Sequence, residues 1–217
     1  MNGILGNFLF SLQEYLYIIP MALIALSFHE VSHAFVSYLQ GDPTPKDAGR
    51  LTLNPLASFD LWGALCMVFF RFGWAKPVPI NPAWYKNKKR GIVLTSLAGP
   101  CSNILLALLF MILWKLYIVY AWSHIGGMWV LRLMEMGIVL NCSLAVFNLL
   151  PISPLDGSKV LYALLPTRIY YKILQYERYG MIVLILLMYF TNILNVPIAM
   201  GVNGIVTLLD KITHFIG

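Results

Sequence analysis

The longest apolar run of the chain, Gly91–Trp122, limits the possible folds more than any other feature of the sequence. A helix that crosses a membrane needs about 20 mostly apolar residues, and this run is long enough to supply one. The whole chain is 59% hydrophobic and 11% charged, whereas soluble domains are about 45–50% apolar and about 25% charged. We therefore expect a multi-pass integral membrane protein with an all-α fold and one domain, residues 1–217.

Hydropathy also predicts further membrane spans on both sides of this run. Breaks such as Gly41-Asp42-Pro43 and the sequence NVP separate them. The predicted spans are Tyr15–Leu39, Met128–Leu150, Gly180–Leu194 and Ile198–Leu209. The last two are marginal in length, so we expect a bundle of about five to six transmembrane helices.

Two further apolar segments are too short to count as membrane spans by themselves. Leu61–Phe72 is too short to cross a bilayer comfortably, so we expect it to dip into the membrane; the alternative is that the first helix runs in the opposite direction. The bundle is therefore expected to include a short membrane-dipping or β-hairpin segment. The N-terminal Asn2–Gln13 either packs at the membrane interface or extends the first helix. It lacks the basic start and the cleavage site of a removable signal peptide.

Positive charge predicts how the chain is oriented in the membrane. The net charge is +6, but the basic residues are few and lie between apolar spans, which favours a membrane orientation signal over nucleic-acid binding. The loop Arg71–Arg90 is basic and contains no acid, and a second basic segment follows Leu150. Because basic loops stay in the cytoplasm, we expect both segments there. The mixture of tyrosines and basic residues at 168–180 predicts an interfacial anchor.

The sequence FHEVSHAF at residues 28–35 places polar groups inside the first predicted span. Residues four apart lie on one face of a helix, so His29 and His33 project together and can share one metal ion. Glu30 lies at the edge of that face, where it can reach a water molecule at the metal without binding the metal itself. Zinc lowers the pKa of such a water to about 7. Since ionisable residues within a membrane are functional-site hypotheses by default, the pattern predicts zinc-dependent hydrolysis of a peptide bond.

A third metal ligand is expected, because catalytic zinc sites have three protein ligands. Asp156 is the leading candidate, since it follows the fourth span in the sequence NLLPISPLDGS, where prolines and a glycine unwind the helix. The same position suits an N-cap for a helix that starts near Ser158, and spacing leaves both roles open. Cys66, Cys101 and Cys142 lie in apolar runs without metal-binding spacing and are interpreted as small buried hydrophobic residues.

Taken together, these stretches resemble the site-2 protease family of intramembrane zinc metalloproteases, in particular its small members without a PDZ domain. The resemblance covers nearly the whole chain and rests on HEVSHAFVSYLQGDPTPKDAGRLTLNPLASFD, GWAKPVPINP, SLAGPCSN and FNLLPISPLDG. It implies that His29, His33 and Asp156 bind one zinc ion per chain and that Glu30 is the general base.

The resemblance also implies roles for two asparagines. Asn103 lies in the pattern G-P-x-x-N and Asn148 in N-x-x-P-x-x-P-L-D-G, and both resemble groups that position a substrate or stabilise an oxyanion. Asparagines in membrane helices also serve as polar contacts between helices, and the sequence leaves this second role open.

Two stretches near the predicted site, 49–55 (GRLTLNP) and 75–82 (AKPVPINP), are expected to be extended. An extended segment can pair with a strand of an unwound substrate, and prolines suit an edge strand because they remove donors. The same segments can equally form a small two-stranded cap over the site. With the site facing the cytoplasm, we expect cleavage in the cytoplasmic half of a substrate helix and a preference for weak helix formers near the cleaved bond.

The leading hypothesis is a zinc-dependent intramembrane endopeptidase of a prokaryotic cell membrane. Its expected partners are transmembrane protein substrates and the lipid bilayer, with no nucleic acid, and a homo-oligomer is left open. The alternative is a non-catalytic zinc-binding membrane protein, either a carrier or a chaperone for transmembrane segments. A carrier needs a second polar cluster along the bundle, which the sequence does not show. Glu30 disfavours a pseudo-protease that binds substrates without cutting them.

Overall fold

A computed structural model of the chain describes most of its residues. The described residues are 2–61, 63, 66, 76–121, 127–166, 169, 179, 180, 182–188 and 190–216, with side chains from Glu14 onward except those of Tyr162 and Leu164. Within these ranges the chain forms helices, turns and irregular segments, and no β-strand. The all-α prediction is confirmed for this part of the chain.

Three long helices form the framework of the fold: α1 (Asn2–Leu39), α4 (Lys88–Leu116) and α6 (Met128–Leu149). The π-helical turn η3 (Tyr117–Ala121) continues α4. Among the described residues, three segments are long and apolar enough to cross a membrane, namely Glu14–Leu39, Lys88–Ala121 and Met128–Leu149. These candidate membrane helices match the predicted spans Tyr15–Leu39, Gly91–Trp122 and Met128–Leu150. The predicted count of five to six spans is not confirmed.

Local sequence explains where these helices begin and end. Gly41 has a φ of +101°, a left-handed conformation that glycine adopts without strain, and it ends α1 with Pro43 close behind. At the start of α4 the Asn87 side chain accepts a hydrogen bond from the Arg90 N–H at 3.1 Å, as an N-cap does. The residues Asn2–Gln13 extend the first helix, which is one of the two arrangements expected for them.

Short elements lie between α1 and α4. They are α2 (Thr44–Asp47), η1 (Pro55–Ser58) and η2 (Pro82–Trp84), and a further short turn, η4 (His214–Ile216), follows the last helix. The Arg50 guanidinium donates to the carbonyls of Ala57 and Lys76 and so joins the two stretches that we expected to be extended. No strand is present at residues 49–55 or 76–81, so no two-stranded cap is seen among the described residues, and the β-hairpin is not confirmed. The predicted dip at Leu61–Phe72 lies almost entirely outside them.

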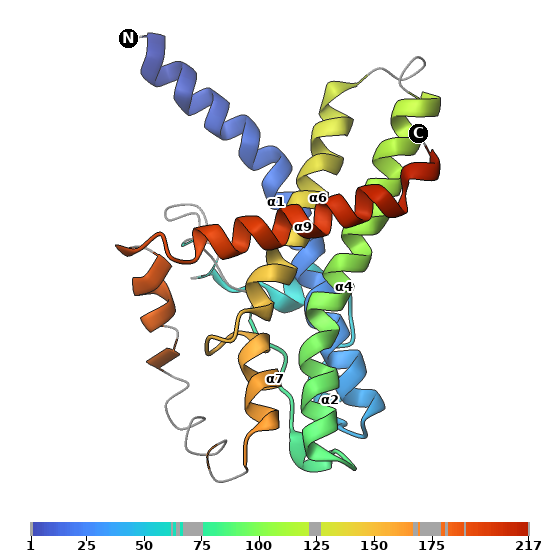
Figure 1. Ribbon diagram of the computed structural model, residues 1–217, viewed down its shortest axis with the longest axis vertical. Helices are drawn as coiled ribbons and strands as arrows, with labels where there is room; N and C mark the ends of the chain where they lie inside the picture. Colours follow the sequence, from blue (N-terminus) through green and yellow to red (C-terminus); the bar gives the residue numbers. More distant parts are fainter. Residues whose placement is uncertain are drawn as a thin grey trace.

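Two further helices pack on the framework. The helix α7 (Asp156–Leu164) lies beside α4, and α9 (Asn195–Ile212) runs across α6 and α4 instead of alongside them (Figure 1). The predicted sixth span Ile198–Leu209 lies within α9, which is not among the helices long and apolar enough to cross a membrane. This part of the prediction is not confirmed, because an apolar run does not reveal how its helix is directed. The predicted fifth span is only partly described.

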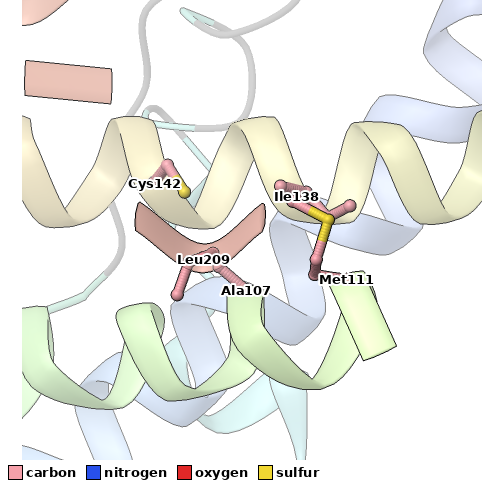
Figure 2. Close-up of a cluster of buried hydrophobic side chains, with 5 residues drawn as sticks. All are labelled: Ala107, Met111, Ile138, Cys142 and Leu209. Atoms are coloured by element: carbon pink, nitrogen blue, oxygen red, sulfur yellow. The ribbon is translucent and has the colours of Figure 1, made fainter. Parts of the chain in front are cut away.

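The hydrophobic core lies where α4, α6 and α9 meet. Figure 2 shows its five buried side chains: Ala107, Met111, Ile138, Cys142 and Leu209. Cys142 is buried as predicted, whereas Cys101 is exposed, which corrects the expectation for that residue. At one end of this interface the buried Lys115 of α4 pairs with Asp210 of α9, with 2.8 Å between Nζ and Oδ1. This ion pair links α4 and α9 in addition to the hydrophobic contacts that hold α9 across the bundle.

Candidate metal centre

The side chains of His29, His33 and Asp156 converge on one point. His29 Nε2 lies 3.2 Å and His33 Nε2 lies 3.0 Å from the same carboxylate oxygen, Asp156 Oδ2, and the two Nε2 atoms are 3.0 Å apart. All three residues are buried, with at most 8% of their surface exposed. Within the described residues this is the one group of three such side chains close enough to hold a metal ion. The structure thus brings together the three ligands expected from the sequence.

The hydrogen bonds of His33 show that the site suits a cation. His33 Nδ1 lies 2.6 Å from the Thr95 carbonyl oxygen, and a carbonyl can only accept, so Nδ1 carries a proton. A neutral His33 then presents a bare lone pair at Nε2 toward the Asp156 carboxylate. Acceptor atoms that face one another in this way repel unless a positive charge lies between them.

The donor set and its dimensions fit zinc. Imidazole nitrogens and a carboxylate oxygen are common zinc ligands, and with bonds of about 2.0–2.1 Å the edges of a tetrahedral site measure about 3.3 Å. The observed separations of 3.0–3.2 Å between the three ligand atoms are close to that value. His29, His33 and Asp156 would therefore supply three of the four corners of such a site.

A glycine lets α4 approach the two histidines. A Cβ atom at Gly99 would lie 2.6 Å from His29 Nε2 and would also overlap His33 Nε2. Real Cβ atoms do not come so close to other heavy atoms. Only glycine can therefore occupy this position while the imidazoles keep their places, which explains the glycine in the stretch SLAGPCSN.

Asp156 is positioned by the turn between α6 and α7. A Cβ at the next residue, Gly157, would overlap the Leu149 carbonyl, so glycine allows α7 to start against the end of α6. Lys159 Nζ lies 3.3 Å from Asp156 Oδ1 and leaves Oδ2 directed at the histidines. Asp156 is the first residue of α7, and its Oδ2 faces the two histidines. This orientation suits metal binding, and the role of Asp156 as a ligand stays a prediction.

Glu30 lies next to the three ligands and is not one of them. It is half-buried, and its Oε2 accepts a hydrogen bond from the Val78 N–H at 3.0 Å. Val78 stands between Pro77 and Pro79, which have no N–H to donate. The proline-rich segment 76–81 therefore offers Glu30 a single backbone donor at this point, and it lies against the site instead of forming a separate cap.

A buried carboxylate, Asp42, anchors the other end of that segment. Its Oδ2 accepts from the Asn81 N–H at 2.8 Å and from the Ser37 hydroxyl at 2.8 Å. Burial by itself raises the pKa of Asp42, but these hydrogen bonds and those of Thr44 outweigh burial and hold the pKa below its ordinary value. The Tyr85 hydroxyl contacts both Ser37 and Thr95, so the cluster also reaches the residue whose carbonyl orients His33. No pattern in the sequence pointed to this cluster.

The two asparagines named in the sequence analysis have different surroundings. Asn103 is fully buried, and its Oδ1 lies 2.6 Å from His29 Nδ1. Asn148 donates to the Leu144 carbonyl of its own helix at 3.0 Å. The contacts of Asn103 associate it with a metal ligand, and the substrate or oxyanion role expected for both residues stays a prediction.

Comparisons with known proteins point to one family. The profile of "Peptidase family M50" matches residues 116–191, a range that contains Asp156 but not the histidine pair. The chain is 38% identical over 179 residues to "Putative zinc metalloprotease YwhC" of Bacillus subtilis, covering 79% of each chain. It is 32% identical over 141 residues to "Putative zinc metalloprotease Rip2" of Mycolicibacterium smegmatis, covering 62% of this chain and 52% of that relative. A comparison with solved structures found no match.

Proposed function

The chain belongs to peptidase family M50, and from that premise we propose that it is a zinc-dependent intramembrane endopeptidase that cleaves transmembrane segments of other membrane proteins. The observation that carries the proposal is the convergence of His29, His33 and Asp156. Both histidines lie in α1, within a segment that is long and apolar enough to cross a membrane. A hydrolytic site placed there meets substrates that are themselves within the membrane.

The residues around the ligands have distinct roles in the proposed reaction. Zinc, when bound, supplies Lewis acidity, which polarises a carbonyl and lowers the pKa of a water to about 7. Glu30 accepts the proton of the attacking water and returns it to the leaving amine. In this structure the Val78 N–H already binds one oxygen of Glu30, Oε2. The segment 76–81 thus orients the general base and lies where a substrate segment can run beside it.

The position of the site along α4 supports cleavage near the cytoplasm. Lys88, Lys89 and Arg90 begin α4 and are exposed, and positive residues favour the cytoplasmic side. Thr95, which orients His33, lies about 10 Å along the helix axis from Lys88. In a hydrocarbon core of about 30 Å, this distance supports a site in the cytoplasmic half. Both named relatives come from bacteria, which supports a prokaryotic cell membrane.

A zinc carrier or a chaperone for transmembrane segments is supported less well. A carrier needs further ligands along its path, and the described part of the chain contains one group of suitable ligands. A chaperone has no need of a carboxylate placed beside metal ligands, as Glu30 is.

A paired substrate assay tests the proposal. A single-span protein reconstituted in liposomes with the zinc-loaded chain is compared with a variant carrying two Leu→Gly changes near the cleaved bond. Each change weakens the substrate helix by about 1 kcal/mol, so we expect cleavage to be faster by about tenfold or more. Mass spectrometry of the products should locate the cut in the cytoplasmic half of the span.

The matched control carries the same two changes in the opposite half of the substrate helix, where they should leave the rate unchanged. Equal rates for all three substrates, or cuts confined to segments outside the membrane, would contradict the intramembrane function. If the chain cleaved only soluble segments in a zinc-dependent reaction, it would still be a metalloprotease, but its substrates would not be transmembrane segments.

A further inference from the structure

We propose that Asn141, to which the sequence analysis gave no role, is a positioning residue that sets the proton of His29 through Asn103, so that His29 presents Nε2 to the metal. The inference rests on the proposed function, because it concerns how one zinc ligand is held. It gives α6, which supplies no ligand, a direct part in building the metal centre.

The contacts form a continuous path across three helices. Asn141 of α6 donates through Nδ2 to the Gly137 carbonyl at 2.8 Å and accepts through Oδ1 from Asn103 of α4 at 2.8 Å. Asn103 also donates to the Ala25 carbonyl at 3.1 Å, and its Oδ1 lies 2.6 Å from His29 Nδ1. Both asparagines have no exposed surface. Water therefore does not compete for these groups.

The direction of every hydrogen bond follows from the backbone carbonyl at the end of the path. The Gly137 carbonyl can only accept, so the amide nitrogen of Asn141 faces it and the amide oxygen faces Asn103. That oxygen also only accepts, as does the Ala25 carbonyl, so Asn103 turns its NH₂ toward both. The oxygen of Asn103 is then left facing His29, and the proton between them belongs to His29 Nδ1.

A proton on Nδ1 leaves Nε2 of a neutral imidazole as the free lone pair. His33 reaches the same state by a shorter route, because the Thr95 carbonyl accepts from its Nδ1 directly. The two ligands are thus oriented by different means. His33 depends on a single carbonyl of α4. His29 depends on the side-chain amide of Asn103, which Asn141 and the Ala25 carbonyl hold together.

The first test measures the zinc affinity of the full chain in detergent by competition with a chelator. Asn141→Leu has a similar volume and removes both hydrogen bonds of the amide. Loss of the group bonded to a metal-binding histidine weakens metal affinity about 10–100-fold. Because Asn141 acts on His29 through Asn103, we expect a decrease at the lower end of that range, about tenfold. Cys142→Ala is the matched control, because Cys142 is the next residue of α6, is equally buried and lies outside the path. It should bind zinc as the wild type does.

Wild-type affinity in Asn141→Leu would overturn the inference and leave the proposed function intact. A wild-type chain that binds no zinc would overturn both.

A second measurement needs no substitution and remains valid if Asn141→Leu does not fold. Nitrogen-15 NMR of the histidines in the zinc-loaded wild type should show zinc at Nε2 and a slowly exchanging proton at Nδ1 of His29 and of His33. Zinc at Nδ1 of His29 would refute the inference. In Asn141→Leu only the Nδ1 proton of His29 should change its chemical shift and exchange faster with water. The Nδ1 proton of His33 is the internal reference. Equal changes at both histidines would show that Asn141 acts on the fold as a whole.

Discussion

Replacing Glu30 with glutamine is expected to abolish cleavage while the protein keeps its zinc. Glutamine cannot accept a proton from water, and general-base catalysis contributes about 10²–10⁴-fold to a rate, so we expect a loss of at least that range. The glutamine side-chain oxygen can still accept the hydrogen bond that the Val78 N–H now donates. Folding and metal binding should therefore be preserved, because Glu30 is not one of the three ligands.

The measurement compares the cleavage rate and the zinc content of Glu30→Gln with those of the wild type. Glu135→Gln is a suitable control, since Glu135 is an exposed glutamate on α6 and makes no contact with the site. Cleavage by Glu30→Gln at a rate near that of the wild type would exclude Glu30 as the general base. Loss of zinc from the variant would instead make Glu30 part of the metal site.

Replacing Gly99 with alanine is expected to eliminate the metal centre. The added Cβ would overlap Nε2 of both histidines, at 2.6 Å from that of His29, and these are the atoms that face the metal. Alanine also favours helix by about 1 kcal/mol over glycine, so α4 itself should form. We expect an intact helical protein without bound zinc and without activity, measured by circular dichroism, metal analysis and the cleavage assay.

Gly204→Ala in α9 separates this effect from the general effect of a methyl group on a helix. A Cβ at Gly204 would meet no atom within 4 Å, so this variant should keep both zinc and activity. Normal zinc binding by Gly99→Ala would show that α4 does not approach the histidines as closely as the structure indicates.

Local geometry explains which parts of the site could be predicted from the sequence. The spacing of His29 and His33 is sufficient to place both on one helix face, because helical periodicity is a local property. Asp156 is 123 residues away from His33, and no periodicity relates them. Its position in the sequence is compatible with a metal ligand and with a helix N-cap, and the family resemblance favours the ligand. In the structure its carboxylate lies beside the two imidazoles.

The groups that orient the ligands were harder to predict. Thr95 and Val78 act through their backbone, and a backbone group has no side-chain signal in a sequence. Asn141 had a weak signal, namely a polar amide inside a predicted span, where such residues form contacts between helices. The sequence did not show that its partner would be Asn103. The direction of α9 was also missed, because it depends on tertiary contacts such as the pair between Lys115 and Asp210.

The central claim is that His29, His33 and Asp156 hold one zinc ion, and zinc-edge X-ray absorption on the purified full chain tests it most directly. Combined with metal analysis, the spectrum should show one zinc per chain bound only by nitrogen and oxygen, with two imidazoles in the first coordination sphere. The Asp156→Ala chain should bind zinc far more weakly. A wild-type chain without zinc, or a spectrum with sulfur from one of the cysteines bound to the metal, would contradict the account.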